Sequence, residues 1–163
     1  MPVAPQPLDP AAFRRALGHF PSGITVVTVR DRAGTDQGMT VSAFCSASLT
    51  PPLVLVCIGH DATIAGAVAG AEGFGVSVLA ERQVALSRKF AGAETNRFEG
   101  VAVTRGLLGV ALLDGAAAQL ECRIIARHEA GDHTIVVGEV VHAREKDGDP
   151  LVYHRGKYRQ FEP

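Results

Sequence analysis

Residues 118–145 have the sequence AQLECRIIARHEAGDHTIVVGEVVHARE, and this stretch carries the clearest secondary-structure pattern in the chain. Small or apolar side chains alternate with polar ones from Ala118 to Arg127. The turn residues Ala130-Gly131-Asp132 separate this half from a second β segment, Thr134 to Arg144. The pattern predicts a long antiparallel hairpin with one face toward a core and one toward water. The alternation places four polar residues on the solvent face: Gln119, Glu121, Arg123 and Arg127.

Shorter elements precede this hairpin. Residues rich in Val, Ile and Thr, or alternating with small residues, predict strands at Ile24 to Arg30, Gln37 to Phe44 and Phe74 to Val78. The continuous apolar run from Leu53 to Ile58 follows Pro51-Pro52 and predicts a strand buried on both faces.

Three helices are expected. In the first, Asp9 is the N-cap, Pro10 opens the helix, and Phe13, Ala16, Leu17 and Phe20 follow at helical spacing. The second begins with Asp61 as cap and ends near Gly70, with Ile64 and Val68 stacked. The third runs from Glu81 to Ala91, with Leu86 and Phe90 stacked in the same way.

The composition indicates a folded chain without a strong surface field. The chain has 163 residues, 47% of them hydrophobic and 20% charged, with a formal net charge of -1. Many strands with few short helices predict a mainly β protein, an antiparallel barrel of closed or half-open, Greek-key-like form. We expect one domain over residues 9–163 after a frayed segment, residues 1–8. Nothing here supplies the basic field that nucleic-acid binding requires.

The sequence also indicates the cellular location of the protein and the state of its cysteines. No targeting segment and no apolar run long enough to cross a membrane is visible, so we expect a cytoplasmic protein. The three cysteines, Cys45, Cys57 and Cys122, are scattered and odd in number. They indicate reduced, half-buried thiols in place of a disulfide framework or a CxxC site.

Several common catalytic motifs are missing. The sequence has no GxGxxG after a strand, no GxxxxGK[ST] loop, no GxSxG elbow and no HExxH. His128, His133 and His142 flank the hairpin, but no acid or second histidine stands at a helical spacing from them. Scattered surface or strand histidines are therefore favoured over a metal site, and no metal is expected.

Four segments in this order resemble the short flavin reductase family, the NAD(P)H:flavin oxidoreductases that serve two-component monooxygenases and fold as an FMN-binding split barrel. They are LGHFPSGITVVT (17–28), GMTVSAFCSASLTPPL (38–53), GDHTIVVGEV (131–140) and PLVYHRGKY (150–158). Each segment alone is a weak signal, whereas their order and spacing together are specific. The resemblance covers about Phe13 to Phe161.

The second segment suits an isoalloxazine ring, which is flat, mostly apolar and edged with acceptors. Small side chains, hydroxyls and backbone amides leave a strand there; without the resemblance, an ordinary strand and polar turn would be favoured. The resemblance implies that the flavin contacts Thr40, Val41, Ser42, Ala43, Phe44, Ser46 and Ala47.

The flavin phosphate requires positive charge or backbone amides. The resemblance implies that its phosphate-ribityl portion lies at Asp61, Ala62 and Thr63, with Asp61 as cap, and that Arg88, Lys89, Phe90 and Ala91 reach the flavin tail. A solvated basic helix face is the alternative explanation for Arg88 and Lys89.

The resemblance implies that Tyr153, His154, Arg155 and Gly156 contact NAD(P)H, where an arginine can bind the pyrophosphate. The alternative is a surface turn before a last strand. His133 is expected to orient the nicotinamide or to stabilise charge on the reduced flavin. No covalent nucleophile and no essential general base is expected, because the cofactors carry the electronic chemistry.

The expected reaction is hydride transfer from NAD(P)H to FMN or FAD, with reduced flavin released to a partner monooxygenase. We also expect a homodimer, because little sequence is devoted to helices that could cover the sheet. The sequence leaves open FMN or FAD and NADH or NADPH. The alternatives are a non-catalytic flavin-binding or electron-transfer protein of the same fold, and a structural β-barrel that binds no flavin.

Overall fold

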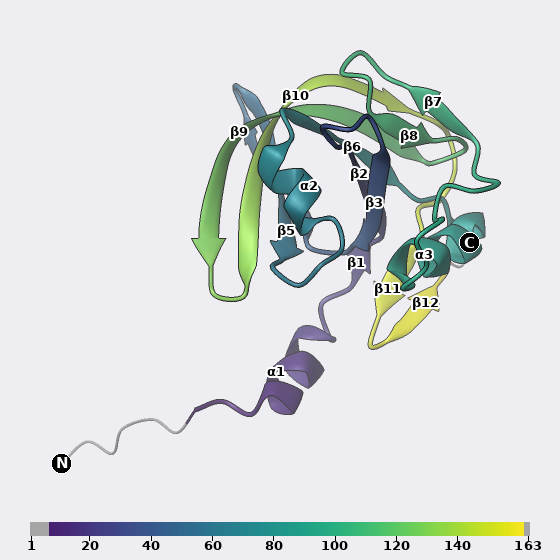
Figure 1. Ribbon diagram of the computed structural model, residues 1–163. Coiled ribbons are helices and arrows are strands. Elements are labelled where there is room, and N and C mark those ends of the chain that lie inside the picture. Colours follow the sequence, from purple (N-terminus) through teal and green to yellow (C-terminus); the bar gives the residue numbers. More distant parts are fainter. Residues whose placement is uncertain (1–6, 162–163) are drawn as a thin grey trace.

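The computed structural model describes residues 7–161, and it confirms a mainly β fold (Figure 1). The first six strands are β1 (Ser22–Gly23), β2 (Thr25–Arg30), β3 (Asp36–Val41), β4 (Phe44–Leu49), β5 (Pro52–Gly59) and β6 (Gly73–Val78). The others are β7 (Val103–Arg105), β8 (Ala111–Leu113), β9 (Ala118–Ala130), β10 (His133–Glu145), β11 (Val152–His154) and β12 (Lys157–Arg159). The helices are α1 (Pro10–Leu17), α2 (Ala65–Gly70), a 3-10 turn η1 (Glu81–Gln83) and α3 (Val84–Ala91).

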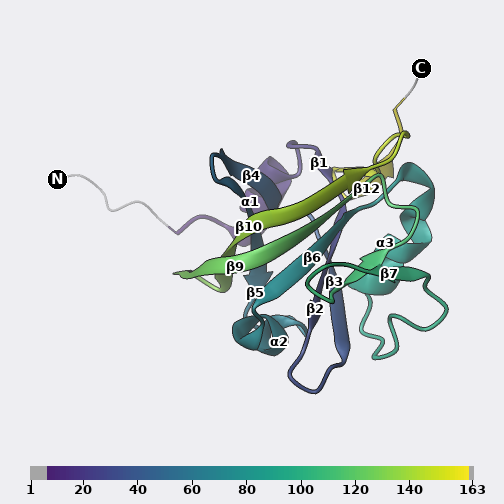
Figure 2. The same cartoon turned by 90° about the horizontal axis from the view of Figure 1, so that it is seen from above.

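Seven strands form one antiparallel sheet in the order β3-β2-β6-β9-β10-β5-β4. Its two edge strands, β3 and β4, follow each other in the chain and are joined only by Ser42 and Ala43. The sheet must therefore curl until its edges approach each other, and the ribbon shows this curl (Figure 2). The single predicted strand from Gln37 to Phe44 is wrong, because the chain bends at Ser42 and continues on the opposite edge.

The long hairpin is confirmed. β9 and β10 pair from Ala130 opposite His133 to Ala118 opposite Glu145. Gly131 opens the two-residue turn with a φ of 65°, which glycine adopts without steric cost. Gly138 marks one of two bulges in this pair, and a Cβ there would lie 2.6 Å from the Phe74 ring. The hairpin can therefore bend over β6 only with glycine at this position.

The predicted solvent face of β9 is wrong at two residues. Gln119 and Glu121 are buried, and Glu121 has no exposed surface. Its two carboxylate oxygens accept hydrogen bonds from the backbone N–H groups of Leu107 and Leu108, both at 2.8 Å. The hairpin of β7 and β8 covers this face, so the two polar side chains serve as acceptors and donors beneath it.

Two groups of buried side chains form the core. The larger lies inside the sheet and includes Val27, Val56, Phe74 and Val136; the smaller lies under α3 around Phe90. The strand predicted to be buried on both faces, β5, alternates instead between buried and half-buried residues. Its outward side chains Leu53, Leu55 and Cys57 retain access to solvent.

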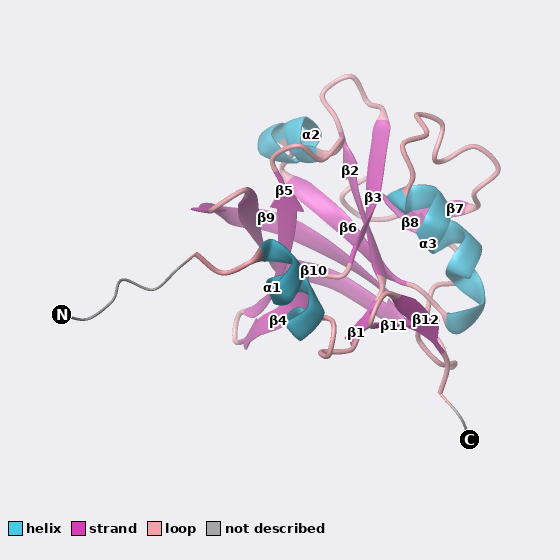
Figure 3. Cartoon of the chain, turned by 90° about the horizontal axis from the view of Figure 1, so that it is seen from below, coloured by secondary structure: helices cyan, strands magenta, loops and turns pink. Residues whose placement is uncertain are grey.

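The helices begin and end near their predicted residues, with two differences. Asp9 caps α1 as predicted, but the helix ends at Leu17, and Phe13, Leu17 and Phe20 are exposed. Helix α1 lies outside the barrel wall (Figure 3). Asp61 does not cap α2, because that helix starts later, with Ile64 at its N-cap and no side-chain capping bond. Residues 1–6 of the predicted frayed segment lie outside the described residues.

Candidate functional site

The bend between the two sheet edges lies at one end of the barrel. Ser42 and Ala43 are exposed there, and the backbone carbonyl of Ala43 accepts a hydrogen bond from Cys57 N–H at 3.0 Å. Val41 is buried just before the bend and Phe44 is half-buried just after it. The small exposed side chains of Ser42 and Ala43 therefore lie on a hydrogen-bonded backbone between the apolar residues Val41 and Phe44. A flat ring could pack against such a surface.

Ser46 and Ala47 lie farther along β4, where the pairing with β5 is interrupted by a bulge. Both are exposed. Ser46 lies opposite Val54, three residues beyond the Ala43–Cys57 contact on β5. At about 3.3 Å per residue, this separates Ser46 from the bend by about 10 Å. Thr40 to Phe44 therefore lie close together at the bend, whereas Ser46 and Ala47 lie farther away along β4.

His133 lies across β5 from this bend: it pairs with Gly59, two residues beyond Cys57, which donates to Ala43 at the bend. A Cβ on Gly59 would lie 3.1 Å from the Asp61 carboxylate and 3.6 Å from His133 Nε2, so these side chains flank the same glycine. His133 Nδ1 lies 2.6 Å from the Asp132 carboxylate. This hydrogen bond and the charge of His133 hold the pKa of Asp132 below its usual range.

Asp61, Ala62 and Thr63 form a turn between β5 and α2, where Asp61 and Thr63 are exposed. The Thr63 hydroxyl accepts a hydrogen bond from Arg97 at 2.8 Å. A phosphate site at the N-terminus of a helix capped by Asp61 is not what the structure shows, since the capping bond is absent and α2 begins at Ala65. Contacts from this turn to a ligand would instead use its exposed backbone and side chains.

Arg97 was not predicted from the sequence, yet it joins β3, the turn before α2 and the end of α3. It is 9% exposed and lies in the loop after α3. One guanidinium nitrogen donates to the Gly38 carbonyl on β3 and to the Thr63 hydroxyl, both at 2.8 Å, and the other donates to the Gly92 carbonyl. Its Nε is buried without a partner. No local pattern in the sequence marks an arginine for burial; only the adjacent aromatic Phe98 indicates a packed loop.

Helix α3 packs against β3 behind the site. The Thr40 hydroxyl donates to the Ser87 carbonyl at 2.7 Å, which ties the strand to the helix. Phe90 is fully buried and packs edge-on against Phe98, with ring centroids 5.1 Å apart. Phe90 therefore supports Gly38 from behind, since a Cβ there would lie 2.8 Å from its ring.

The basic residues of α3 point in two directions. Arg88 lies over the ring of Tyr158, 5.6 Å from its centroid, which is the geometry of a cation–π contact. Lys89 donates a hydrogen bond to the carbonyl of Glu99 and so tethers the loop that carries Arg97. Ala91 is exposed at the end of the helix. In this arrangement Lys89, and not Arg88, lies toward the segments that Arg97 joins.

The predicted nicotinamide segment lies at the same end of the barrel. Tyr153 on β11 pairs with Ser22 on β1, and Thr25 pairs with Val41 just before the bend. Three residues of extended chain separate Ser22 from Thr25, a distance of about 10 Å. Segments more than a hundred residues apart in sequence are therefore neighbours in the fold.

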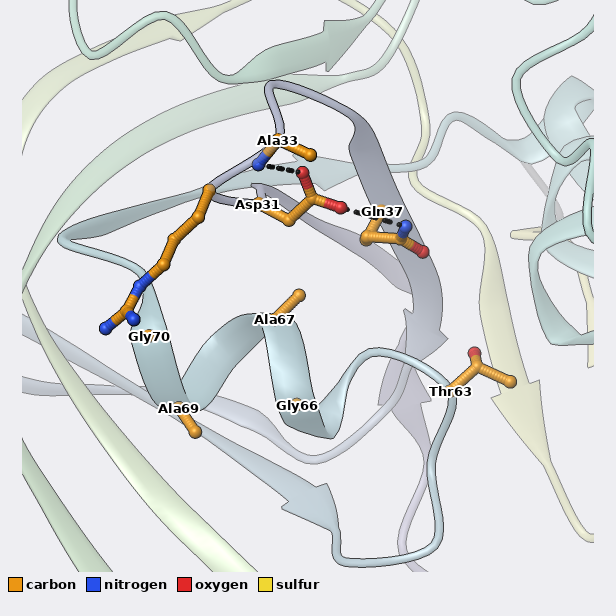
Figure 4. A pocket seen from close by; sticks show the side chains of 9 residues that line it. Asp31, Ala33, Gln37, Thr63, Gly66, Ala67, Ala69 and Gly70 are labelled. Carbon is orange, nitrogen blue, oxygen red and sulfur yellow. Dashed lines mark hydrogen bonds between the residues drawn. The ribbon is translucent and has the colours of Figure 1, made fainter.

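A pocket of about 660 Å³ opens beside Thr63 between α2 and the turn from β2 to β3 (Figure 4). Small side chains of α2, including Ala67 and Ala69, form its floor. The Asp31 carboxylate on its rim accepts hydrogen bonds from Ala33 N–H and from the Gln37 side chain. These bonds hold the turn to which Asp31 belongs. Of the predicted flavin residues only Thr63 lines this pocket.

The cysteines are free and differ in exposure, whereas half-buried thiols were predicted for all three. Cys45 is exposed, Cys57 is half-buried and Cys122 is buried. Burial raises the pKa of Cys57 and raises that of Cys122 to about 12. Within residues 7–161 no group of three or more His, Cys, Asp or Glu side chains could hold a metal, and no helix is long and apolar enough to cross a membrane.

Comparisons with known proteins identify the family of this chain. The family model for the flavin reductase like domain matches residues 17–162. The chain belongs to this family. It is 43% identical over 159 residues to an NADH-dependent flavin reductase of Rhodococcus sp, a match that covers 95% of this chain and 88% of the relative.

Two further matches are a monooxygenase reductase component and a solved structure. The chain is 41% identical to the reductase component of a 4-nitrophenol 4-monooxygenase/4-nitrocatechol 2-monooxygenase of Rhodococcus opacus, over 97% of this chain and 84% of the relative. It matches the structure of the Streptomyces globisporus NADH:FAD oxidoreductase SgcE6 in complex with NAD and FAD fragments, with a TM-score of 0.90 and 39% identity over 98% of both chains.

Proposed function

We propose that this protein is a flavin reductase that oxidises NADH and reduces FMN or FAD. The observation that carries the proposal is a chain of strand pairings that links the predicted segments. Val41, just before the bend, pairs with Thr25, which follows the pair of Ser22 with Tyr153. Just after the bend, Ala43 accepts a hydrogen bond from Cys57, and His133 pairs with Gly59, two residues farther along β5. Membership of the flavin reductase like family supports it.

The residues present fit a flavin. The ring would lie against the exposed bend from Thr40 to Phe44, with the small residues Ser42 and Ala43 closest to it. The flavin, when bound, supplies the hydride-accepting chemistry, and the nicotinamide supplies the hydride. The protein contributes position, since two rings held in register replace a chance collision in solution.

Each candidate side chain then has a role that requires no covalent chemistry. His133, fixed by Asp132 through Nδ1, presents Nε2 toward Gly59 and Asp61, where it can orient a bound nicotinamide or stabilise charge on a reduced ring. Thr63 and Lys89 lie beside the Arg97 contacts and face the phosphate-bearing part of the flavin. Tyr153 to Gly156 contact the nicotinamide dinucleotide.

The test is steady-state oxidation of NADH and NADPH, each with added FMN and FAD, by the purified protein. We expect NADH oxidation that continues through many equivalents of flavin, because reduced flavin leaves and oxidised flavin replaces it. A protein that binds flavin but consumes no more than one equivalent of NADH would be a flavin-binding module, and the proposal would fall.

The assembly and the partner belong to the same proposal. The protein works as a homodimer in the cytoplasm and passes reduced flavin to a monooxygenase. Apolar side chains left exposed on one copy support the dimer: Phe13, Leu17, Phe20, Leu49 and Ile125. Large apolar side chains exposed in this way gain from burial against a second copy. Light scattering at micromolar concentration tests the dimer, and a stable monomer would contradict it.

A further inference from the structure

The two tyrosines of this chain, Tyr153 and Tyr158, lie opposite each other in the short pair of strands β11 and β12. Their ring centroids are 5.4 Å apart and their planes are inclined at 64°, which is an edge-on contact. Tyr153 is 36% exposed, whereas Tyr158 is half-buried and packs against the core residues around Phe90. One tyrosine is therefore anchored in the protein, and the other contacts it at the surface.

Strand pairing alone holds β11 and β12 weakly. Each has three residues, and β1, the third strand of their sheet, has two. A hairpin of this size is marginally stable unless it packs against other elements. The place of Tyr153 therefore depends on the side-chain contacts that fix Tyr158, its partner in the strand register.

Ser87 of α3 supplies one such contact. Its hydroxyl shares a hydrogen bond of 3.0 Å with the Tyr158 hydroxyl, and Ser87 is 1% exposed. Helix α3 lies beside β12 at this point (Figure 1). The Ser87 carbonyl accepts a hydrogen bond from the Thr40 hydroxyl at 2.7 Å. A single buried residue therefore contacts both Tyr158 and the strand that leads to the bend at Ser42.

The next residue of α3 restrains the same ring. The Arg88 guanidinium lies 5.6 Å from the centroid of the Tyr158 ring, within the range of a cation–π contact. A tyrosine hydroxyl inside a protein usually has a polar partner, and Ser87 is that partner here. The Tyr158 ring is therefore fixed at its hydroxyl by Ser87 and on its ring by Arg88.

We propose that Tyr158 is a positioning residue for hydride transfer: anchored to α3 by Ser87, it holds Tyr153 in place relative to Thr40 and so aligns the nicotinamide with the flavin ring. The inference rests on the proposed function, in which Tyr153 contacts the dinucleotide and Thr40 lies against the flavin. Tyr158 acts through Tyr153 and exchanges no proton or electron. Alignment matters because the reacting atoms must approach to about 3–3.5 Å.

Tyr158→Phe tests the inference, because it removes the hydroxyl and keeps the packed ring. After anaerobic mixing of the FMN-loaded variant with saturating NADH, we expect hydride transfer about 3- to 10-fold slower than in the native protein, as for the loss of one hydrogen bond. The dissociation constant of FMN should be unchanged. Ser87→Ala should slow the step equally, since it removes the same hydrogen bond and leaves the carbonyl that binds Thr40.

The double variant Ser87→Ala/Tyr158→Phe completes a double-mutant cycle. Its rate should equal that of either single variant, because one shared hydrogen bond can be lost only once. A double variant slowed by the product of the two single effects would overturn the inference. A loss of FMN affinity in Tyr158→Phe as large as the loss in rate would also overturn it, because the residue would then support the whole barrel end.

Tyrosine fluorescence gives a reading without redox chemistry. The chain has no tryptophan, so this emission comes from Tyr153 and Tyr158 alone, and from Tyr153 alone in Tyr158→Phe. Titration of the flavin-free native protein with NAD+ should change the emission. In Tyr158→Phe the midpoint should lie at an NAD+ concentration about 3- to 10-fold higher. Emission that does not respond to NAD+ in the native protein would overturn the inference.

Ser77→Ala is the matched control. Ser77 on β6 is also a buried serine, and its hydroxyl accepts a hydrogen bond from Leu113 N–H at 2.9 Å, beneath the β7–β8 hairpin. This variant should lose stability as Ser87→Ala does and transfer hydride at the native rate. Slowing equal to that of Ser87→Ala would overturn the inference, because any lost buried hydroxyl would then have the same effect.

Failure of this inference and failure of the proposed function give different results. A native rate of hydride transfer in Tyr158→Phe overturns the role of Tyr158 and leaves the flavin reductase activity standing. Native protein that does not oxidise NADH overturns both.

Discussion

Two sets of arginines in this protein differ in what surrounds them. Arg97 is 9% exposed and donates to two carbonyls and a hydroxyl from three separate segments. Arg14, Arg15 and Arg155 are exposed and line a pocket without an acidic side chain. A buried guanidinium must satisfy its donors within the protein, so Arg97 builds the site. The exposed guanidiniums keep donors available for a ligand.

The largest effect should come from removing the buried arginine. In Arg97→Ala the carbonyls of Gly38 and Gly92 lose their donor in a buried setting, at about 1–3 kcal/mol for each unsatisfied group. We expect a lower free energy of unfolding by about 3 kcal/mol and weaker flavin binding. Urea denaturation and flavin fluorescence titration measure the two effects.

Arg97→Lys provides the matched control, because one ammonium can reach some but not all of the same acceptors. Its stability should fall between those of the native protein and Arg97→Ala. A native-like free energy of unfolding in Arg97→Ala would show that the three segments hold together without this side chain, and the contrast between the two arginine sets would then disappear.

Lys89→Ala should weaken flavin affinity by about 1.5–3 kcal/mol and leave turnover at saturating flavin nearly unchanged. In the proposed function Lys89 contacts the flavin tail, away from the reacting ring, so its loss would remove uniform binding. Lys89 also tethers the Arg97 loop through the Glu99 carbonyl. Fluorescence titration gives the dissociation constant, and an unchanged value would remove Lys89 from the site.

The exposed region is tested by His154→Ala/Arg155→Ala. We expect a KM for NADH about tenfold higher, which corresponds to about 1.4 kcal/mol, with flavin binding nearly intact. Added salt should weaken NADH binding to the native protein more than to this variant, because exposed charges are screened over about 8 Å at physiological ionic strength. A variant that loses flavin but keeps its KM for NADH would assign this segment to the other ligand.

The smallest effect should come from the exposed pair Asp132 and His133. His133 lowers the pKa of Asp132, so the ionised carboxylate stabilises the fold above its unfolded-state pKa, and this contribution is lost as pH falls through the lower folded-state pKa. The gain of native protein over Asp132→Asn in thermal denaturation should therefore be present at neutral pH and vanish in acid. A difference that persists below the folded-state pKa would indicate another cause.

Local patterns in the sequence were sufficient for the longer strands, but they merged β3 with the start of β4 and did not indicate β7 and β8. Alternation over residues 118–145 predicts β9 and β10 within a residue or so, because both strands repeat their own period over many residues. The pattern was wrong at Glu121, since the hairpin that covers this face, β7 and β8, has only three residues in each strand. A polar side chain beneath a cover looks the same in sequence as one in water.

The candidate site was predicted only where a contiguous motif carries it. The bend at Ser42 and the turn at His133 lie in such motifs, and strand pairing brings them together. Arg97 could not be found in this way, because its burial depends on Gly38, Thr63 and Gly92, which meet only in the folded chain. The same limit applies to the chain just after α1, where His19 meets Arg155 across 136 residues.

The most direct test is anaerobic mixing of the flavin-loaded protein with NADH, followed by flavin absorbance in a stopped-flow instrument. If this barrel end holds nicotinamide and flavin in contact, flavin absorbance should bleach in a single fast phase, and deuterium at the transferred C4 position of NADH should slow that phase. Bound flavin that stays oxidised after NADH is added would contradict the account.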